Sequence, residues 1–109
     1  MNPERIERLL NQVAAGDVTA ADALEELRDF PYQKLDHTTI DTHRELRQGT
    51  PEVVFGAGKS GEHLVEILDR IYKNHHRALA TRVSRRKARI VEEALPEVRY
   101  DRLSRLLAL

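Results

Sequence analysis

The sequence has no cysteine and no tryptophan, and it contains only one methionine, four prolines and five glycines. Without cysteine, the chain has no disulfide, no thiolate nucleophile and no cysteine-bound zinc or iron–sulfur site. No apolar run approaches the roughly 20 residues of a membrane-spanning helix. The first residues also lack the apolar core of a signal peptide. We therefore expect a cytoplasmic protein without a membrane partner.

Charged residues are abundant but unevenly placed. The 109 residues are 33% charged and 40% hydrophobic, which suits one small globular domain. Residues 1–31 carry three basic and seven acidic side chains, residues 32–69 carry four and seven, and residues 70–109 carry eleven and four. The three segments therefore have net charges of −4, −3 and +7. This gradient indicates either an anionic partner for the last segment or neutralisation between parts of the chain.

The N-terminal segment is typical of two short helices. Asn2 is a candidate N-cap, and apolar residues follow at helical spacing: Ile6, Leu9, Leu10 and Val13. Thr19 is placed to cap a second helix after a short turn. We expect a helical hairpin over residues 1–30 and a small α/β domain over residues 31–109.

Strand and helix patterns alternate after Pro31. A strand is plausible around residues 38–43, and the later elements are a strand at Val53–Phe55, a helix capped by Ser60, a strand within Ala78–Val83, a helix capped by Ser84 and a last strand from residue 98. The β-α-β-α-β order from Val53 favours parallel strands with right-handed crossovers. The expected fold is α/β, with a three- or four-stranded, mostly parallel sheet.

The stretch "VVFGAGKSGEHL" raises the question of a phosphate-binding loop. A nucleotide-binding P-loop needs a glycine five positions before the second one, and Val53 occupies that place. The stretch is therefore not the phosphate-binding loop of an NTPase. A strand, a glycine turn and a helix start still offer free N–H groups to an anion, with Lys59 adding charge. The alternative is that Gly56 and Gly58 only permit the turn.

The stretch "IDTHRELRQGTPE" holds a second group of ionisable residues. Arg44 and Arg47 are three positions apart, so on a helical turn they share a face and suit a phosphate or carboxylate. Asp41 and Arg44 have the same spacing and could pair with each other. The alternative is an ordinary group of surface ion pairs.

Histidines and a basic run suggest two further kinds of site. His37, Asp41 and His43 would point to one side of a strand, but their spread along it disfavours a shared metal ion. His75, with His76, ends a helix, where a cation suits the helix dipole. Residues 82–89, "RVSRRKAR", contain five basic residues, although the near-neutral pI and scarce aromatic residues disfavour nucleic-acid binding.

The stretch from Ile40 to Ser60 resembles the signature of the LarB type of the AIR-carboxylase-like family. The matching elements are Asp41-x-x-Arg44, Arg47-Gln48-Gly49, Pro51-Glu52, a short β run and Gly58-Lys59-Ser60. Thr50 departs from the pattern, because the family usually has a bulky aromatic residue there. The resemblance covers most of the chain from Leu35 onward.

This resemblance implies a role in nickel-pincer cofactor biosynthesis, which serves lactate racemase maturation. The family's enzymes carboxylate the pyridinium ring of nicotinic acid adenine dinucleotide with carbon dioxide or bicarbonate, with a divalent cation as an optional helper. They also hydrolyse its phosphoanhydride, leaving a biscarboxylated pyridinium mononucleotide. A C-terminal AIR-carboxylase-like domain carries the family's nucleophilic cysteine. We expect this cysteine-free chain to be a non-catalytic N-terminal piece, without its own cofactor, of a homo-oligomeric enzyme.

The resemblance also implies which residues bind substrate, namely Asp41, Arg44, Arg47, Gln48, Gly49, Glu52, Gly58, Lys59 and Ser60. Arg44, Arg47 and Lys59 would suit a pyrophosphate or the nicotinate carboxylate. Asp41 or Glu52 would orient a ribose hydroxyl, a water or an arginine. One alternative is an assembly module without ligand contact, and another is a nucleic-acid binder through residues 82–89. Substrate binding requires the three cations to share an exposed cleft, whereas an assembly role would bury or scatter them.

Overall fold

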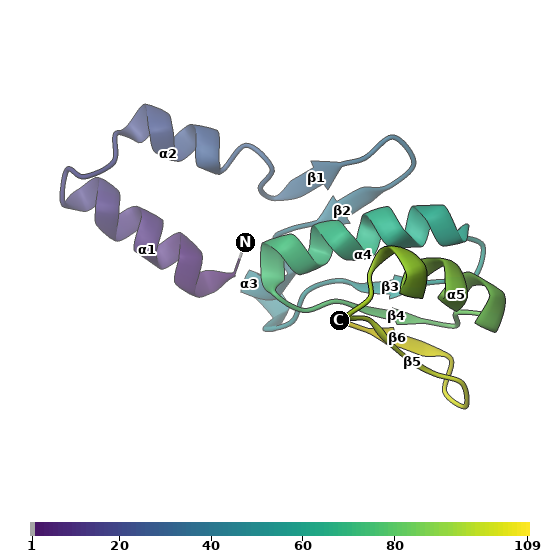
Figure 1. Cartoon of the computed structure of the whole chain (residues 1–109). Helices are drawn as coiled ribbons and strands as arrows, with labels where there is room; N and C mark the ends of the chain where they lie inside the picture. Colours follow the sequence, from purple (N-terminus) through teal and green to yellow (C-terminus); the bar gives the residue numbers. More distant parts are fainter. Residues whose placement is uncertain (1) are drawn as a thin grey trace.

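The computed structural model describes residues 2–109, which form an elongated molecule of 50 × 25 × 23 Å. The predicted helical hairpin is present as α1 (Pro3–Ala14) and α2 (Ala20–Glu26), at one end of the molecule (Figure 1). Both predicted caps are confirmed, since Asn2 and Thr19 accept backbone N–H groups of the first turns. No helix in the described part of the chain is long and apolar enough to cross a membrane.

A small β-hairpin follows the helices. Strand β1 (Tyr32–Lys34) pairs antiparallel with β2 (Thr39–Asp41), and the short helix α3 (Arg44–Gln48) comes next. The strand expected around residues 38–43 is thus confirmed as β2. It belongs to its own two-stranded sheet and does not join the main one.

The α/β class is confirmed by the main sheet, whose strand order is β3-β4-β6-β5. Its elements are β3 (Val53–Phe55), α4 (Gly61–His75), β4 (Leu79–Thr81), α5 (Arg85–Ala94), β5 (Arg99–Asp101) and β6 (Leu106–Ala108). The expectation of a mostly parallel sheet is wrong, because β3–β4 is parallel while β4–β6 and β5–β6 are antiparallel. The apolar last segment returns from β5 as a hairpin strand and inserts beside β4.

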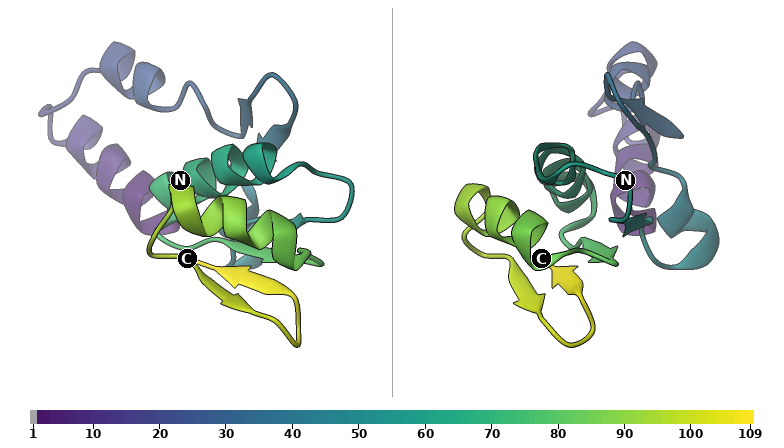
Figure 2. Two further views of the ribbon diagram at one scale, coloured as in Figure 1. Left: turned by 45° about the vertical axis from the view of Figure 1, so that its right-hand side comes forward. Right: turned by 90° about the vertical axis from the view of Figure 1, so that its right-hand side faces the viewer.

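Helices cover one face of this sheet. The register aligns Val54, Ala80, Leu107 and Tyr100 across the four strands, and these side chains face the helices. The neighbouring row is Val53, Leu79, Ala108 and Arg99, which faces the other way. Helices α4 and α5 lie on the first face, and no element of residues 2–109 lies on the second (Figures 1 and 2).

Helix α4 lies between the two sheets (Figure 1). Its buried positions recur at helical spacing and include Leu64, Ile67, Leu68 and Ile71, each at most 2% exposed. Ile40 of β2 joins the same core from the β-hairpin side. Three side-chain contacts with α4 fix the β1–β2 hairpin further. Asn74 donates to Gln33 at 3.1 Å, His37 Nε2 lies 2.8 Å from a Glu66 oxygen, and the rings of His37 and His63 stack 3.8 Å apart.

The start of α4 packs closely against the middle of α5 at Gly61. A Cβ atom on Gly61 would lie 2.7 and 2.9 Å from side-chain atoms of Ile90. We predict that Gly61→Ala lowers the free energy of unfolding by about 1–3 kcal/mol, the usual cost of overpacking. Urea denaturation measures this change.

The matched control is the double variant. In an Ile90→Ala background, the same Gly61→Ala change should cost less, because Cδ1 and Cγ2 of Ile90 are gone and only its Cβ, at 2.9 Å, remains close. Equal costs in both backgrounds would contradict the close packing of Gly61 against Ile90.

Candidate functional site

The segment from Asp41 to Glu52 folds into a compact polar cluster. The Asp41 carboxylate accepts hydrogen bonds from the His43 backbone N–H at 3.0 Å and from Arg47 Nη2 at 2.6 Å. The Glu52 carboxylate accepts the Asp41 backbone N–H at 2.9 Å. Arg47 Nη1 also lies 2.8 Å from Nδ1 of His43. Asp41 therefore pairs with Arg47, not with Arg44.

These bonds favour the ionised form of Asp41. Burial opposes ionisation, but the hydrogen bond from Arg47, the backbone N–H of His43 and the positive charge of Arg47 together outweigh it. The pKa of Asp41 is consequently held below its ordinary value. The pair stays charged at neutral pH, and this salt bridge loses its stabilising effect only in acid, as the pH falls below 3.8.

Arg44 differs from Arg47 in lacking a partner. Its Nε is buried and makes no hydrogen bond within residues 2–109, and no ion pair of the described chain involves its guanidinium. Leaving a buried donor unsatisfied costs about 1–3 kcal/mol, more for a charged group. Arg44, three positions before Arg47 on α3, is therefore a positively charged donor whose Nε has no partner in the described residues.

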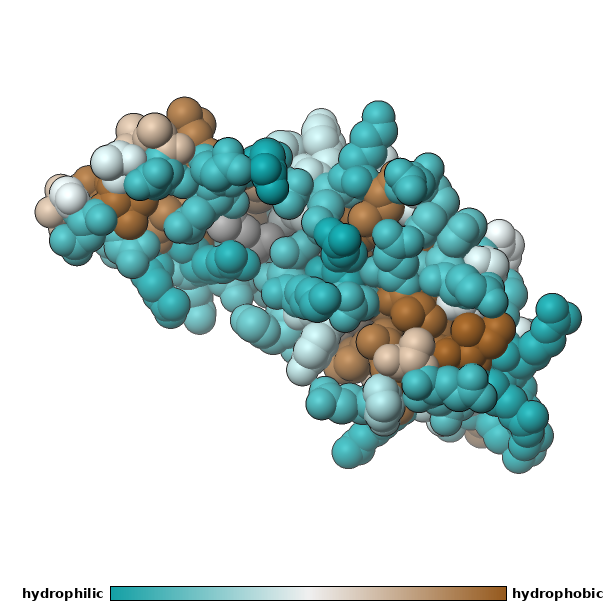
Figure 3. Space-filling view, turned by 45° about the horizontal axis from the view of Figure 1, so that its top comes forward, coloured by the Kyte–Doolittle hydropathy of each residue, from teal (hydrophilic) through white to brown (hydrophobic). Residues whose placement is uncertain are grey.

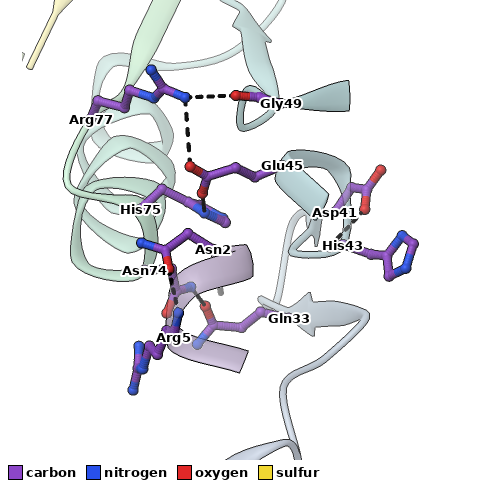
Figure 4. A network of polar contacts seen from close by, with 10 residues as sticks. All are labelled: Asn2, Arg5, Gln33, Asp41, His43, Glu45, Gly49, Asn74, His75 and Arg77. Atoms are coloured by element: carbon purple, nitrogen blue, oxygen red, sulfur yellow. Dashed lines mark hydrogen bonds and ion pairs between the residues drawn. The ribbon is translucent and has the colours of Figure 1, made fainter. Parts of the chain in front are cut away.

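A second network, absent from the predicted site, anchors α3 to the end of α4. The Glu45 carboxylate hydrogen-bonds Nδ1 of His75, which is 4% exposed. Arg77 lies 3.5 Å from the other Glu45 oxygen and donates to the Gly49 carbonyl at 2.9 Å. Glu45 points toward His75 and Arg77, whereas Asp41 and His43 point away from it (Figure 4).

His75 is the last residue of α4, as predicted, but its side chain is buried, whereas that of the neighbouring His76 is exposed. Burial lowers the pKa of His75, and the positive charge of Arg77 acts in the same direction. The hydrogen bond and charge of Glu45 raise it by less, so the pKa of His75 lies below the ordinary 6.5. Its Nε2 is buried without a hydrogen-bond partner in the described chain.

The glycine turn lies at the opposite end of β3. A Cβ at Gly56 would lie 2.7 Å from Val83 and 2.8 Å from the Thr81 carbonyl oxygen, and Gly58 has a φ of +80°. Close approach and left-handed backbone explain these two glycines. Lys59 Nζ donates to the Phe55 carbonyl at 3.2 Å.

The starts of α4 and α5 lie side by side at this end. As predicted, Ser60 and Ser84 cap the two helices, each accepting a backbone N–H. Together with Arg86 and Lys87 they line a hollow of about 230 Å³. Lys87 Nζ donates to the Gly56 carbonyl at 3.2 Å. The helix starts, Arg86 and Lys87 give this hollow positive potential, which Glu62, also part of its lining, partly offsets.

The structure thus divides the predicted residues between two places. Asp41, Arg44, Arg47, Gln48, Gly49 and Glu52 lie before β3, and Gly58, Lys59 and Ser60 lie after it. Arg44, Arg47 and Lys59 do not share one cleft, so they have the scattered arrangement expected of an assembly module and not the single cleft expected for substrate binding. The three residues considered as metal ligands also have different partners. His37 hydrogen-bonds Glu66, whereas His43 and Asp41 contact Arg47. Residues 2–109 contain no group of three or more histidine, aspartate or glutamate residues placed to hold a metal.

Comparison with known proteins gives one match. The family described as the LarB/PurE-like N-terminal domain matches residues 32–109, which include both ends of β3. No curated protein matches the chain.

The buried His75 leads to a testable pH dependence. Because its folded pKa is depressed, the neutral form stabilises the fold above pH 6.5, and this stabilisation is lost as the pH falls through the lower folded pKa. An NMR titration of the imidazole should give a His75 pKa below 6.5.

Glu45→Gln provides the matched variant. It removes the charge that raises the pKa of His75, so the midpoint should fall further. A His75 midpoint at or above 6.5, or one that rises in Glu45→Gln, would contradict the buried contact.

Proposed function

Because this chain belongs to the LarB/PurE-like N-terminal domain family, we propose that it is the accessory domain of a LarB-type, AIR-carboxylase-like enzyme. In this proposal it helps to bind nicotinic acid adenine dinucleotide. Carboxylation and phosphoanhydride hydrolysis take place on a separate catalytic domain. That domain supplies the nucleophile, since this chain has no cysteine, and it receives the carbon dioxide or bicarbonate and any divalent cation.

The unpartnered guanidinium of Arg44 carries the proposal. The guanidinium group is planar and permanently charged, and its N–H groups match the two oxygens of a carboxylate or phosphate better than they match other ligand groups. The neighbouring Arg47 is already neutralised by Asp41 at 2.6 Å, so Arg44 retains the free positive charge of this cluster. Arg44 is only half-buried, and an anion that contacts the accessible part of its guanidinium would pair a charge that no carboxylate of the described residues pairs.

The far end of β3 offers a second contact. The hollow beneath the starts of α4 and α5 presents helix N-termini with Arg86 and Lys87, which favours phosphate oxygens. The dinucleotide carries anionic groups in two regions, the nicotinate carboxylate and the pyrophosphate. We assign the carboxylate to the Arg44 end and the pyrophosphate to the Ser60 end. With the two anionic groups bound at two places, Arg44 and Lys59 need not lie in one cleft to bind the same dinucleotide.

A second candidate function is that of an assembly module, which the uncovered sheet face favours. Val53 and Phe55 are 45% and 49% exposed on that face, and apolar surface of this kind often marks a protein contact. This function does not require Arg44 or Lys59.

Calorimetric titration of the chain with the dinucleotide distinguishes the two functions. Arg44→Gln should weaken binding by about 10-fold or more, because a charge-assisted hydrogen bond contributes about 1.5–3 kcal/mol. Arg28→Gln is the matched control. Arg28 is exposed and pairs with Glu25 in the hairpin, so its loss should leave affinity unchanged.

ATP serves as the control ligand, since it has phosphates but no nicotinate carboxylate. Its binding should be insensitive to Arg44→Gln and should weaken in Lys87→Gln. Wild-type affinity of Arg44→Gln for the dinucleotide would overturn the binding function and leave the assembly module.

A further inference from the structure

The uncovered face of the main sheet has a defined chemical character. Its central row is Val53, Leu79 and Ala108, with Arg99 at the β5 end. Beside it, Phe55 is half exposed and the guanidinium of Arg82 lies 4.2 Å from the centre of its ring. The face is therefore apolar in the middle and basic at its margin.

A hollow of about 290 Å³ opens at one end of this face. Val53, Leu79 and Ala108 form its apolar wall, and Arg77 lies at its rim. The two carboxylates near the face are engaged elsewhere. Glu52 accepts the Asp41 backbone N–H, and Asp101 accepts the Ser104 backbone N–H at 2.9 Å. Glu52 lines the hollow and Glu45 lies 3.5 Å from Arg77, so the charge of Arg77 is partly offset. Arg82 and Arg99 form no ion pair within the described residues and keep the margin basic.

The helical hairpin has the complementary character. Leu10 and Leu24 are 60% and 71% exposed, and apolar side chains gather at this end of the molecule (Figure 3). Residues 1–31 carry seven acidic and three basic side chains, a net charge of −4. In the same chain, the hairpin projects away from the sheet and leaves its open face uncovered (Figures 1 and 2).

We propose that the open sheet face binds the α1–α2 hairpin of a second copy of this chain. Leu24 or Leu10 would enter the hollow beside Leu79, and the acidic hairpin residues would face Arg82 and Arg99. The contact gives the sheet helices on both faces, which is how α/β sheets usually bury their apolar residues. It is heterologous, because two different surfaces of the chain meet. It does not depend on dinucleotide binding.

Sedimentation velocity over a range of protein concentrations tests this contact. The wild-type chain should associate reversibly and less strongly at 0.5 M than at 0.1 M NaCl, since salt screens the exposed charges. Leu24→Glu damages only the hairpin, and Phe55→Glu damages only the face. Each variant alone should remain at the monomer mass of 12.5 kDa.

Mixing provides the decisive measurement. An equimolar mixture of Leu24→Glu and Phe55→Glu retains one intact hairpin and one intact face, so it should form a dimer that grows no further. Tyr32→Glu, a change at an exposed position of β1, should associate like the wild type. Circular dichroism and urea unfolding check that each variant is folded.

Three results would overturn the proposal. A wild-type chain that stays monomeric at 0.2 mM would assign the face to a different protein or domain. Association that survives Leu24→Glu but not Phe55→Glu would indicate two sheet faces packing symmetrically. A mixture that stays monomeric, with both variants folded, would show that hairpin and face do not meet.

Discussion

The packing of α4 between two β layers is the constraint on which the other features depend. Four of its apolar residues are essentially fully buried, and each contributes about 1.5–3 kcal/mol when removed from water. One layer is the main sheet and the other is the β1–β2 hairpin, which contributes Ile40. The helix therefore fixes the position of every segment that contacts it, from the glycine turn at its start to His75 at its end.

The two ends of α4 set the two halves of the candidate site. At its start, Gly61 allows α5 to approach, so two helix N-termini meet beside the glycine turn. In its last turn, His75 holds Glu45 and thereby orients α3. The opposite side of α3 then presents the Asp41–Arg47 pair, with Arg44 left unpaired beside it. The predicted residues are separated because Asp41 to Glu52 precede β3 and Gly58 to Ser60 follow it.

Local sequence patterns are sufficient to predict the helices and most of the strands. The caps Asn2, Thr19, Ser60 and Ser84 mark their helices because capping depends on residues a few positions apart. Strand partners depend on the whole chain, and so the insertion of β6 between β4 and β5 was missed. The same reason hides the contact of Glu45 with His75, which are 30 positions apart. The sequence motif identified Arg44, but only the fold reveals that its Nε has no acceptor in the described residues.

The proposed role of Arg44 is to bind an anionic group of the dinucleotide. The most direct test follows the Nε–H signal of Arg44 by ¹⁵N NMR while nicotinic acid adenine dinucleotide is added. The account predicts that this signal shifts and exchanges more slowly with solvent, while the Nε–H signal of Arg28 does not change. A ligand that shifts backbone signals near Ser60 but leaves the Arg44 Nε–H signal unmoved would contradict the claim.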